Sequence, residues 1–314
     1  MNDYQYLMNH EHHYVTFSNY LKDRFGKKCA KISFNIGCTC PNRDGTKGVG
    51  GCLYCSKNLS GDFAGKVSDS LAEQFRQGKE MMHQKWNASI YIAYLQAGTN
   101  TYGDLNELKN IYNTIISLDP NIKILSIATR PDCINKEIIK ALKEINNKCE
   151  VWVELGFQSM YDETKSKMNC LHTTADFLTA MKLLNEASIK IVVHVINGLP
   201  GETTEMMLET IKFVNALHPF GIKIHMLHLM KNTLLGEEYL KEPFPLLSKE
   251  QYVELVSRQL SYIDASTIIF RLTGDAPKDD IIEPLWTLKK FVVLNDIDKY
   301  MRKNNIYQGD LCKK

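Results

Sequence analysis

The sequence of 314 residues lacks any apolar run that approaches the ~20 residues a helix needs to cross a bilayer. Its first residues, Met-Asn-Asp-Tyr-Gln-Tyr, lack the basic segment and following apolar segment of a secretory signal. Linkers rich in Gly or Ser are absent, and a formal net charge of +2 gives no strong excess of either sign. We therefore expect a cytoplasmic protein without membrane association. Its 44% hydrophobic and 24% charged residues are typical of an enzyme and exclude a disordered chain.

Cysteine, by contrast, is plentiful, because the chain has nine. Cytoplasmic thiols stay reduced, so clustered cysteines are there more often metal ligands or catalysts than disulfides. Four of the nine are scattered, and we expect each to be a buried or incidental residue: Cys133, Cys149, Cys170 and Cys312. The other five fall within 27 residues: Cys29, Cys38, Cys40, Cys52 and Cys55. This second group predicts a site for a metal or a cluster.

Segments rich in β-branched and aromatic residues alternate with segments of helical spacing. Six units of this kind in series predict an α/β fold with a parallel sheet, either open and doubly wound or closed as a partial or full (β/α) barrel. The residues 267–273 predict one more strand, and 281–303 predict a helix. We expect an N-terminal extension (1–30), a (β/α)6 core (31–235) and a C-terminal extension packed on the barrel, facing the substrate (236–314). The six expected strands are 31–37, 89–98, 123–130, 149–158, 190–197 and 221–230.

Polar and glycine-rich motifs stand at the carboxyl ends of these expected strands, where parallel α/β sheets gather functional groups. The first strand leads to the segment that carries Cys38, Cys40, Cys52 and Cys55, which we call the cysteine loop. A buried Glu in the fourth strand would be costly unless paired, which favours a function for Glu154. The later motifs are Gln96-Ala-Gly-Thr99, Thr129-Arg-Pro-Asp132, Glu154 with Gln158, and Gly198-Leu-Pro-Gly-Glu202.

The cysteine loop suits two kinds of metal site. Cys38, Cys40, Cys52 and Cys55 supply the four thiolates of a structural zinc site. A [4Fe-4S] cluster is also held by cysteines, and with three ligands it keeps one iron open for chemistry. Spacing alone favours zinc. The polar motifs on the other strands favour the cluster, because a structural zinc needs none of them.

Several of these motifs together resemble the radical S-adenosylmethionine (SAM) superfamily, and more narrowly its bacterial branch related to the radical domain of the Elongator catalytic subunit. The resemblance covers nearly the whole chain and implies a partial or full parallel barrel. It implies that Cys40, Cys52 and Cys55 are the cluster ligands, although eleven residues separate Cys40 from Cys52 where many members have three. Cys38 is the neighbour that could replace Cys40. The motifs are the Cys-x-x-Cys pair, 41–48, 129–132, 154–159, 198–202, 271–277 and 307–309.

The resemblance also implies a mechanism and a set of SAM-binding residues. Superfamily members use a [4Fe-4S] cluster and SAM, and reductive cleavage of SAM gives a 5′-deoxyadenosyl radical. Tyr54, Gly198 and Leu199 would lie near adenine, whereas Gln96, Ala97, Gly98 and Thr99 would approach the methionine amino group. Arg130 would bind a carboxylate, with an ion pair to Asp132 or Glu154 as the alternative, and Glu154 with Gln158 would bind the ribose or the methionine end. The catalytic residues are unknown, and the candidates are Arg271, Asp275, Lys223 and His225.

The family relationship points to tRNA, with a wobble uridine side chain as the expected substrate. Two basic segments near the chain ends, 22–31 and 289–314, fit phosphate contacts and are expected beside the active site. A donor such as flavodoxin or ferredoxin would supply electrons. We expect no acetyltransferase domain and no dependence on acetyl-coenzyme A. Two alternatives stay open: a radical SAM enzyme acting on a small metabolite or peptide, and a zinc-stabilised binding protein without catalysis.

Overall fold

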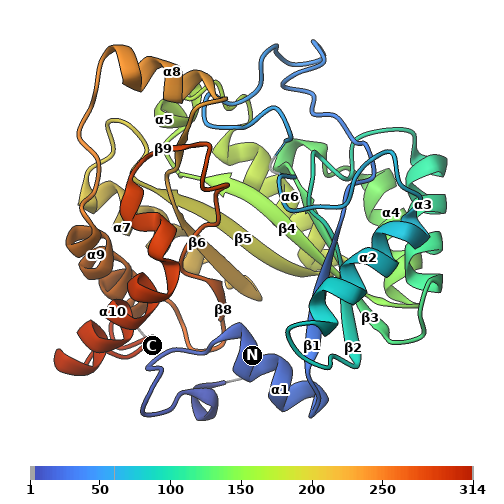
Figure 1. Cartoon of the computed structure of the whole chain (residues 1–314), viewed down its shortest axis with the longest axis horizontal. Coiled ribbons are helices and arrows are strands. Elements are labelled where there is room, and N and C mark those ends of the chain that lie inside the picture. Colours follow the sequence, from blue (N-terminus) through green and yellow to red (C-terminus); the bar gives the residue numbers. More distant parts are fainter. Residues whose placement is uncertain (1–3, 60, 313–314) are drawn as a thin grey trace.

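One sheet of seven parallel strands organises the molecule. The computed structural model describes residues 4–59 and 61–312. Neighbours in the sheet follow the order β1-β2-β3-β4-β5-β6-β8, and every pair is parallel. The sheet curves without closing, so the expected parallel barrel is a partial one (Figure 1). The strands are β1 (Cys29–Phe34), β2 (Ile90–Leu95), β3 (Ile122–Thr129), β4 (Glu150–Gln158), β5 (Lys190–Asn197), β6 (Gly221–Met226) and β8 (Ile268–Arg271).

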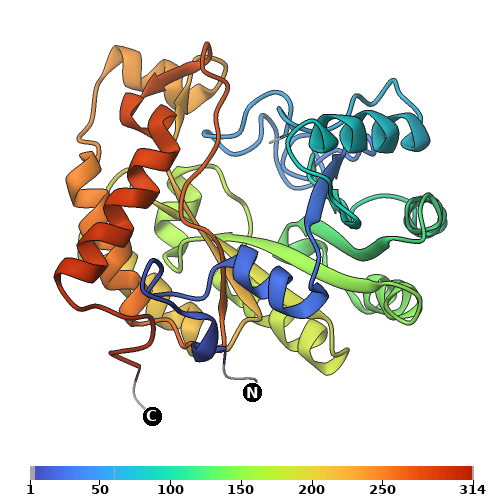
Figure 2. The same ribbon diagram turned by 60° about the horizontal axis from the view of Figure 1, so that its bottom comes forward.

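Helices cover the convex face of this sheet (Figures 1 and 2). Five of them begin at a Ser, Thr, Asp or Asn whose side-chain oxygen accepts a backbone N–H of the first turn, which satisfies an otherwise unpaired donor. Their apolar sides join outward strand residues in one core, in which Val153, Leu142 and Leu184 are fully buried. These five helices are α2 (Leu71–His83), α3 (Leu105–Ser117), α4 (Lys136–Asn146), α6 (Thr174–Glu186) and α7 (Thr204–Asn215).

The remaining elements lie at the two ends of the strands and along the side of the sheet that β8 forms. Helices α9 (Lys249–Ser261) and α10 (Lys290–Lys303) lie together at this side (Figure 2). Short helices α5 (Asp162–Lys167) and α8 (Leu234–Lys241) lie near the carboxyl ends of the strands (Figure 1). A small antiparallel ribbon joins β7 (Leu229–Met230) to β9 (Ile281–Glu283). Three 3-10 turns complete the fold: Gln5–Leu7, Pro131–Cys133 and Leu285–Lys289.

Helix α1 (Phe17–Phe25) closes the concave face at the end where the strands begin (Figure 1). Its Tyr20 and Leu21 pack in one apolar cluster with inward side chains of β2, β3, β4 and β8. Trp152 is fully buried at the centre of this cluster and contacts the rings of Phe17, Phe220 and Phe270. The concave face therefore has an apolar floor at its strand-start end.

Two expected elements differ from the structure. The helix expected over 281–303 begins only at Lys290, and residues 281–283 form β9 instead. Pro284 explains the difference, since a residue before proline avoids the helical region. The strand expected over 221–230 ends at Met226 and resumes as β7. The strand expected over 267–273 is present as β8 and joins the main sheet, and the domain boundaries at 30/31 and 235/236 stay predictions.

None of the helices in the described part of the chain is long and apolar enough to span a membrane.

We predict that Trp152→Ala lowers the free energy of unfolding by about 3–5 kcal/mol, the usual cost of removing a fully buried large aromatic side chain. Urea unfolding followed by circular dichroism measures the change. Trp86→Ala is the matched control, because Trp86 is 42% exposed and surface substitutions usually change stability by about 0.5 kcal/mol or less. Equal losses in the two variants would contradict the assignment of the floor.

Candidate active site

The cysteine loop, residues 38–59, follows β1 and is braced from within by Arg43. The Arg43 guanidinium donates hydrogen bonds to the backbone carbonyl oxygens of Cys55 (2.9 Å), Ser56 (2.6 Å) and Lys57 (3.2 Å). Gly51 leaves room for this side chain, since a Cβ there would lie 2.6 Å from Arg43 Nε. Arg43 therefore holds the second half of the loop to the first. Arg43 lies in the motif 41–48 but was not among the predicted site residues.

A second set of hydrogen bonds docks the cysteine loop on the turn between α5 and α6. The Asn42 side-chain amide donates to the carbonyl oxygen of Asn169. The Asn169 amide donates in return to the carbonyl oxygen of Gly51 at 2.8 Å, and the Leu53 N–H donates to the carbonyl oxygen of Met168 at 3.0 Å. The Leu53 carbonyl oxygen accepts from an N–H in the first turn of α8. The loop is thus fixed between two neighbouring segments (Figure 1).

Arg130 brings the end of β3 to this loop. It binds the Asp132 carboxylate in bidentate fashion, at 3.0 and 2.9 Å, and its Nη1 lies 3.9 Å from Cys40 Sγ. Lys47 of the loop reaches the same carboxylate at 2.8 Å. Burial opposes ionisation of Asp132, but hydrogen bonds and charge from Arg130 and Lys47 outweigh it and lower its pKa. The guanidinium already has a carboxylate partner within the chain and faces the predicted ligand Cys40.

Cys170 lies against Cys52, a contact between residues far apart in the sequence. Cys170 is buried, as expected, and it accepts a hydrogen bond from the Tyr54 hydroxyl at 3.6 Å. Interaction with the Cys170 thiol, together with burial, raises the pKa of Cys52 well above its ordinary value, and the same interaction lowers the pKa of Cys170. The Asn42 amide donates to Cys52 Sγ at 3.7 Å. No sequence pattern could have found the contact with Cys170.

The motif 96–99 packs directly on the cysteine loop. Gly98 has φ +78°, and a Cβ there would lie 2.1 Å from the carbonyl oxygen of Cys38, so only glycine fits. The Thr99 N–H donates to the carbonyl oxygen of Thr39 at 3.1 Å. Ala97 is buried beneath the same loop, where Gly61 approaches it. The close approach expected of Gly98 is therefore observed as a contact between two loops.

The structure brings two of the predicted SAM-binding residues, Tyr54 and Leu199, into one cluster and places Gln158 at the end of β4. Gln158 has φ +69°, and its amide nitrogen lies over Gly156, where a Cβ would approach it to 2.8 Å. Tyr54 packs in one apolar cluster with Leu199, Cys170 and the start of α8. Gly198, which precedes Leu199, also has a positive φ of +88°. Residues predicted to lie near one cofactor thus belong to neighbouring strand ends.

A layer of polar side chains lies on the concave face, two residues along each strand from the apolar floor. Its centre is Glu154, two residues after Trp152 and fully buried. Its carboxylate accepts hydrogen bonds from Lys31 of β1 (2.8 Å), Ser126 of β3 (2.6 Å) and Lys223 of β6, and contacts His194 Nε2 of β5 at 2.8 Å. The ammonium of Lys31 lies over the ring of Tyr94 of β2 at 3.6 Å. Five strands thus meet at one carboxylate.

The charges in this layer are unequal, because two lysines share one carboxylate. Burial alone would raise the pKa of Glu154, but the charges of Lys223 and Lys31 outweigh it and hold that pKa well below its ordinary value. Burial lowers the pKa of Lys223. Burial and the charge of Lys223 lower the pKa of His194 to about 4, so this imidazole is neutral near pH 7. The Glu154 carboxylate therefore also has a structural role, because its partners come from four other strands of the sheet.

The substrate candidates extend from this layer toward the end of β8. His225, two residues after Lys223, stacks on His194 at 5.6 Å between ring centroids, and its buried Nε2 has no hydrogen-bond partner among the described residues. Arg271 pairs with Asp275 at 2.8 Å. Asp275 also binds Lys290 of α10 at 2.9 Å. The four candidates therefore lie along one side of the concave face, and their roles stay predictions.

The thiols of the cysteine loop bear on the kind of metal that the site suits. None of the nine cysteines, all of which lie among the described residues, forms a disulfide; Cys40 is buried, and Cys52 and Cys55 are half-buried. Within residues 4–59 and 61–312, no three His, Cys, Asp or Glu side chains converge closely enough to hold a single metal ion. A four-thiolate zinc site is therefore not formed. A cluster has several metal atoms of its own and is held by thiolates, and Cys40, Cys52 and Cys55 stay its predicted ligands.

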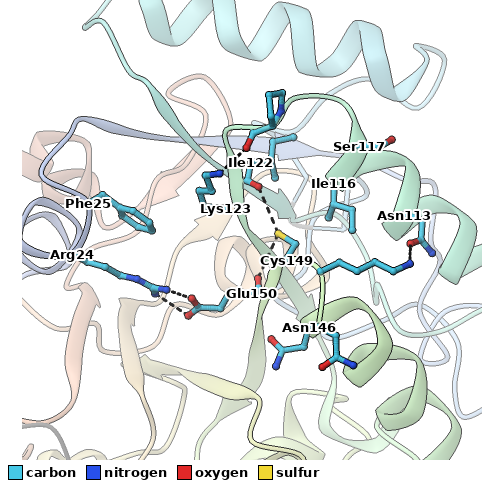
Figure 3. Close-up of a pocket in the computed structure, with 13 residues that line it drawn as sticks. Arg24, Phe25, Asn113, Ile116, Ser117, Ile122, Lys123, Asn146, Cys149 and Glu150 are labelled. Carbon is cyan, nitrogen blue, oxygen red and sulfur yellow. Dashed lines mark hydrogen bonds and ion pairs between the residues drawn. The ribbon is translucent and has the colours of Figure 1, made fainter.

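A cavity of about 800 Å³ lies where the strands begin, at the end of the sheet opposite to the cysteine loop (Figure 3). Lys123 at the start of β3 and Glu150 at the start of β4 line it, and Arg24 of α1 pairs with Glu150. It is therefore remote from the cysteine loop, which follows the other end of β1. Within the basic segment 22–31, Arg24 lies at this cavity, whereas Lys31 belongs to the polar layer; the expected phosphate contacts of the segment stay a prediction. In the segment 289–314, Lys290 is paired with Asp275, and Lys313 and Lys314 lie outside the described residues.

Fold and site together define an α/β partial-barrel protein that presents a cysteine loop and polar motifs at the carboxyl ends of its strands. Residues 35–214, more than half of the chain, match the model of the radical SAM superfamily, and residues 219–303 match that of the Radical_SAM C-terminal domain. The chain belongs to the radical SAM superfamily. It is an enzyme of that superfamily, with its cofactors, a [4Fe-4S] cluster and SAM.

Several relatives place the chain more narrowly. The uncharacterized protein YtqA of Bacillus subtilis (strain 168) is 41% identical over 301 residues, 96% of this chain and 93% of YtqA. The tRNA uridine(34) acetyltransferase of Methanocaldococcus infernus is 30% identical over 186 residues, 58% of this chain and 34% of that enzyme. The solved structure of Methanocaldococcus infernus Elp3 with an N-terminal deletion has a TM-score of 0.68 at 19% identity, over 90% of this chain and 64% of that chain. This chain thus spans only part of the acetyltransferase and of Elp3.

We predict that Cys40→Ala, Cys52→Ala and Cys55→Ala each lose most of the cluster iron after anaerobic reconstitution, because each removes one of the three predicted protein ligands. Cys38→Ala is the control and keeps the iron content of the wild type. Iron analysis and the visible absorption of the cluster measure the outcome. Loss of iron in Cys38→Ala together with retention in Cys40→Ala would reverse the assignment of these two residues.

We predict that Glu154→Gln lowers the free energy of unfolding by about 3–5 kcal/mol, because it removes the ionised partner of buried Lys223 and of half-buried Lys31. Urea unfolding provides the measurement. Glu144→Gln is the control, since Glu144 is exposed and its pair with Lys109 belongs to a class worth about 0–1 kcal/mol. The double variant Glu154→Gln/Lys223→Met should recover part of the loss. A loss no larger than that of the control would refute the central role of this carboxylate.

Proposed function

We propose that this radical SAM enzyme modifies the side chain of a wobble uridine in tRNA. The observation that carries the proposal is the 30% identity to a tRNA uridine(34) acetyltransferase over 58% of this chain. The likeness in fold to Elp3 over 90% of the chain is consistent with it. Because the chain matches only about a third of the acetyltransferase, transfer of an acetyl group is not part of the proposal.

We infer that Cys40, Cys52 and Cys55 hold the cluster, and that the neighbouring strand ends bind SAM. When bound and reduced, these cofactors supply a 5′-deoxyadenosyl radical. The residues of the chain bind and orient the cofactors and the substrate, and they exclude water from the site. The docked loops at Gly98 and Asn169 fix the distance between the cysteines and the strand ends. The remaining proposed SAM contacts are Tyr54, Gln96, Ala97, Thr99, Arg130, Gln158, Gly198 and Leu199.

The polar layer around Glu154 lies between the apolar floor and the strand ends that carry the proposed SAM contacts. Glu154 was expected to bind SAM, but its carboxylate is occupied by four partners of the chain, so we infer that it positions the strands that carry the SAM contacts. The layer and the aromatic floor beneath it keep bulk water from the strand-start end. This matters for radical chemistry, because a closed site prevents side reactions of a reactive intermediate.

The substrate end of the site lies toward β6 and β8. His225 has a buried, unpartnered ring nitrogen, and Arg271 with Lys290 supplies positive charge around Asp275. Ring nitrogens and guanidinium groups are suitable partners for a uracil edge and a phosphate, respectively. A small metabolite or a peptide is the alternative substrate class. The comparison of tRNA nucleosides described next separates this class from tRNA.

We predict that tRNA from cells lacking the gene contains an altered wobble uridine, measured by liquid chromatography and mass spectrometry of the nucleosides. The mature modification should disappear and an earlier form should accumulate. The wild-type gene should restore the mature nucleoside, whereas a gene encoding Cys55→Ala should not. A gene encoding Cys312→Ala is the matched control and should restore it, because Cys312 lies in the last described residues, outside the cysteine loop.

An unchanged profile of wobble uridines in the deletion strain would contradict the tRNA proposal and favour a small metabolite or a peptide. A second measurement checks the direct action. The reconstituted protein should form 5′-deoxyadenosine from SAM faster with tRNA from the deletion strain than with tRNA from the wild type. Equal rates with both would also contradict the proposal.

A further inference from the structure

The cavity of about 800 Å³ at the strand-start end has no part in the proposed reaction. It lies among the ends of α1, α3 and α4 and the starts of β3 and β4. Figure 3 shows Arg24 and Phe25 on one side of it and Asn113 and Ile116 on the other, with Glu150 between them. Its volume falls in the range of sites that bind small molecules, which is about 300–1,000 Å³.

Three cationic side chains line this cavity, those of Arg24, Lys123 and Lys148, together with one carboxylate, that of Glu150. Glu150 already binds two cations, because Arg24 donates to it at 2.9 Å and the Lys190 ammonium lies 2.9 Å away. Burial opposes ionisation of Glu150, but the hydrogen bonds from Arg24 and Lys190 outweigh it and lower its pKa to about 2. Glu150 therefore does not compensate the charges of Lys123 and Lys148.

Neutral acceptors hold these two lysines. Lys123 Nζ donates to the carbonyl oxygen of Pro120 at 2.8 Å, and Lys148 Nζ donates to the side-chain oxygen of Asn113 at 2.8 Å. Within residues 4–59 and 61–312, neither ammonium forms an ion pair. Each lysine is thus oriented at the cavity while its charge stays available to a ligand.

Other negative charge near the cavity is too small to cancel the cations. Three helices end here, and each helix end carries about half a unit of negative charge. Four cations, with Lys190 included, exceed the single carboxylate of Glu150 by three units, which is more than the three helix ends supply. The charge of Lys148 also reaches Glu144, but this carboxylate pairs with Lys109 at 2.5 Å and does not line the cavity. The cavity therefore suits an anion.

The lining is apolar as well as basic. Phe25, Ile116 and Ile122 contribute an aromatic ring and aliphatic surface beside the cations. A ligand that matches both parts carries a phosphate on a ring system. Ammonium groups bind phosphate as point charges, and aromatic side chains stack on nucleic-acid bases. A nucleotide meets both conditions, whereas an inorganic ion uses only the first.

We propose that this cavity is a nucleotide-binding site, with Lys123 and Lys148 at the phosphate and Phe25 against the base. The nucleotide is a unit of an RNA chain or a free mononucleotide. Exposed Lys27 and Lys28 follow Phe25 along the chain, and they supply further positive charge for the neighbouring phosphates of an RNA. The proposal does not rest on the reaction at the cysteine loop, which lies at the other end of the strands.

The test is isothermal titration calorimetry of the reconstituted enzyme with adenosine 5′-monophosphate (AMP), in saturating SAM so that the proposed cofactor site is filled. We expect one AMP for each chain. The double variant Lys123→Gln/Lys148→Gln should bind AMP about 10-fold more weakly or worse, because it loses charged hydrogen bonds to the phosphate. Phe25→Leu keeps an apolar side chain but removes the ring, so it should weaken binding of AMP and not that of inorganic phosphate.

The matched control is Lys182→Gln/Lys299→Gln, which removes the same charge from exposed positions on α6 and α10. It should bind AMP as the wild type does. All four substituted lysines are exposed, so we expect both double variants to fold, and urea unfolding checks this.

Binding of tRNA, measured by fluorescence anisotropy at several salt concentrations, distinguishes the two sources of the nucleotide. For a unit of RNA, the cavity double variant binds tRNA more weakly than the control variant does. The slope of log Kd against log salt then falls by about 1 for each lost phosphate contact. Weaker binding of AMP with unchanged binding of tRNA assigns a free mononucleotide.

Equal affinities of the wild type and the cavity variant for both AMP and tRNA would overturn the proposal, as would equal losses in the control variant. Inorganic phosphate that binds as tightly as AMP would overturn the assignment to a nucleotide. The AMP titration needs neither RNA nor turnover, so failure of the wobble-uridine proposal would leave its result unchanged.

Discussion

The buried carboxylate of Glu154 is the constraint on which the rest of the structure depends. An ionised group without contact with water is tolerated only where cations and donors surround it. Lys31 comes from the first strand of the sheet and Lys223 from the sixth, so satisfying Glu154 in the fourth strand requires the sheet to curve. The partial barrel thus follows from the pairing of one acid as well as from the twist of parallel strands.

The layers of the concave face follow from the two-residue period of a strand. Ile92, Ile124 and Trp152 form the floor with α1, and the residues two positions further along the same strands form the polar layer. Two positions beyond that lie residues such as Gln96 and Gly156, at the level of the strand ends. The cysteine loop packs on the strand ends. Its position therefore depends on the strands that Glu154 holds together.

Local features of the sequence sufficed for the parallel sheet and the cysteine loop. Strand period, helix caps and cysteine spacing are all short-range patterns, and the close approach at Gly98 follows from the conformational freedom of glycine. The partners of the site could not be predicted in the same way. Cys170 meets Cys52, and Asn169 meets Asn42, only because the turn after β4 folds over the loop after β1. The charge pattern of segment 22–31 does not reveal that Lys31 points to Glu154.

The distribution of charge bears on the kind of molecule that the open end of the barrel receives. Among the described residues, Lys31 and Lys223 pair with Glu154, and Arg271 and Lys290 pair with Asp275, while burial lowers the pKa of Lys223. Lys31 and Lys223 are largely buried, so their charge is screened by water much less than that of a surface pair. A ligand that brings negative charge to this side relieves the imbalance, whereas a cationic ligand increases it. A nucleotide meets this condition through its phosphate, and a basic peptide does not. The charge on this side of the barrel is therefore compatible with the nucleic-acid substrate that we propose.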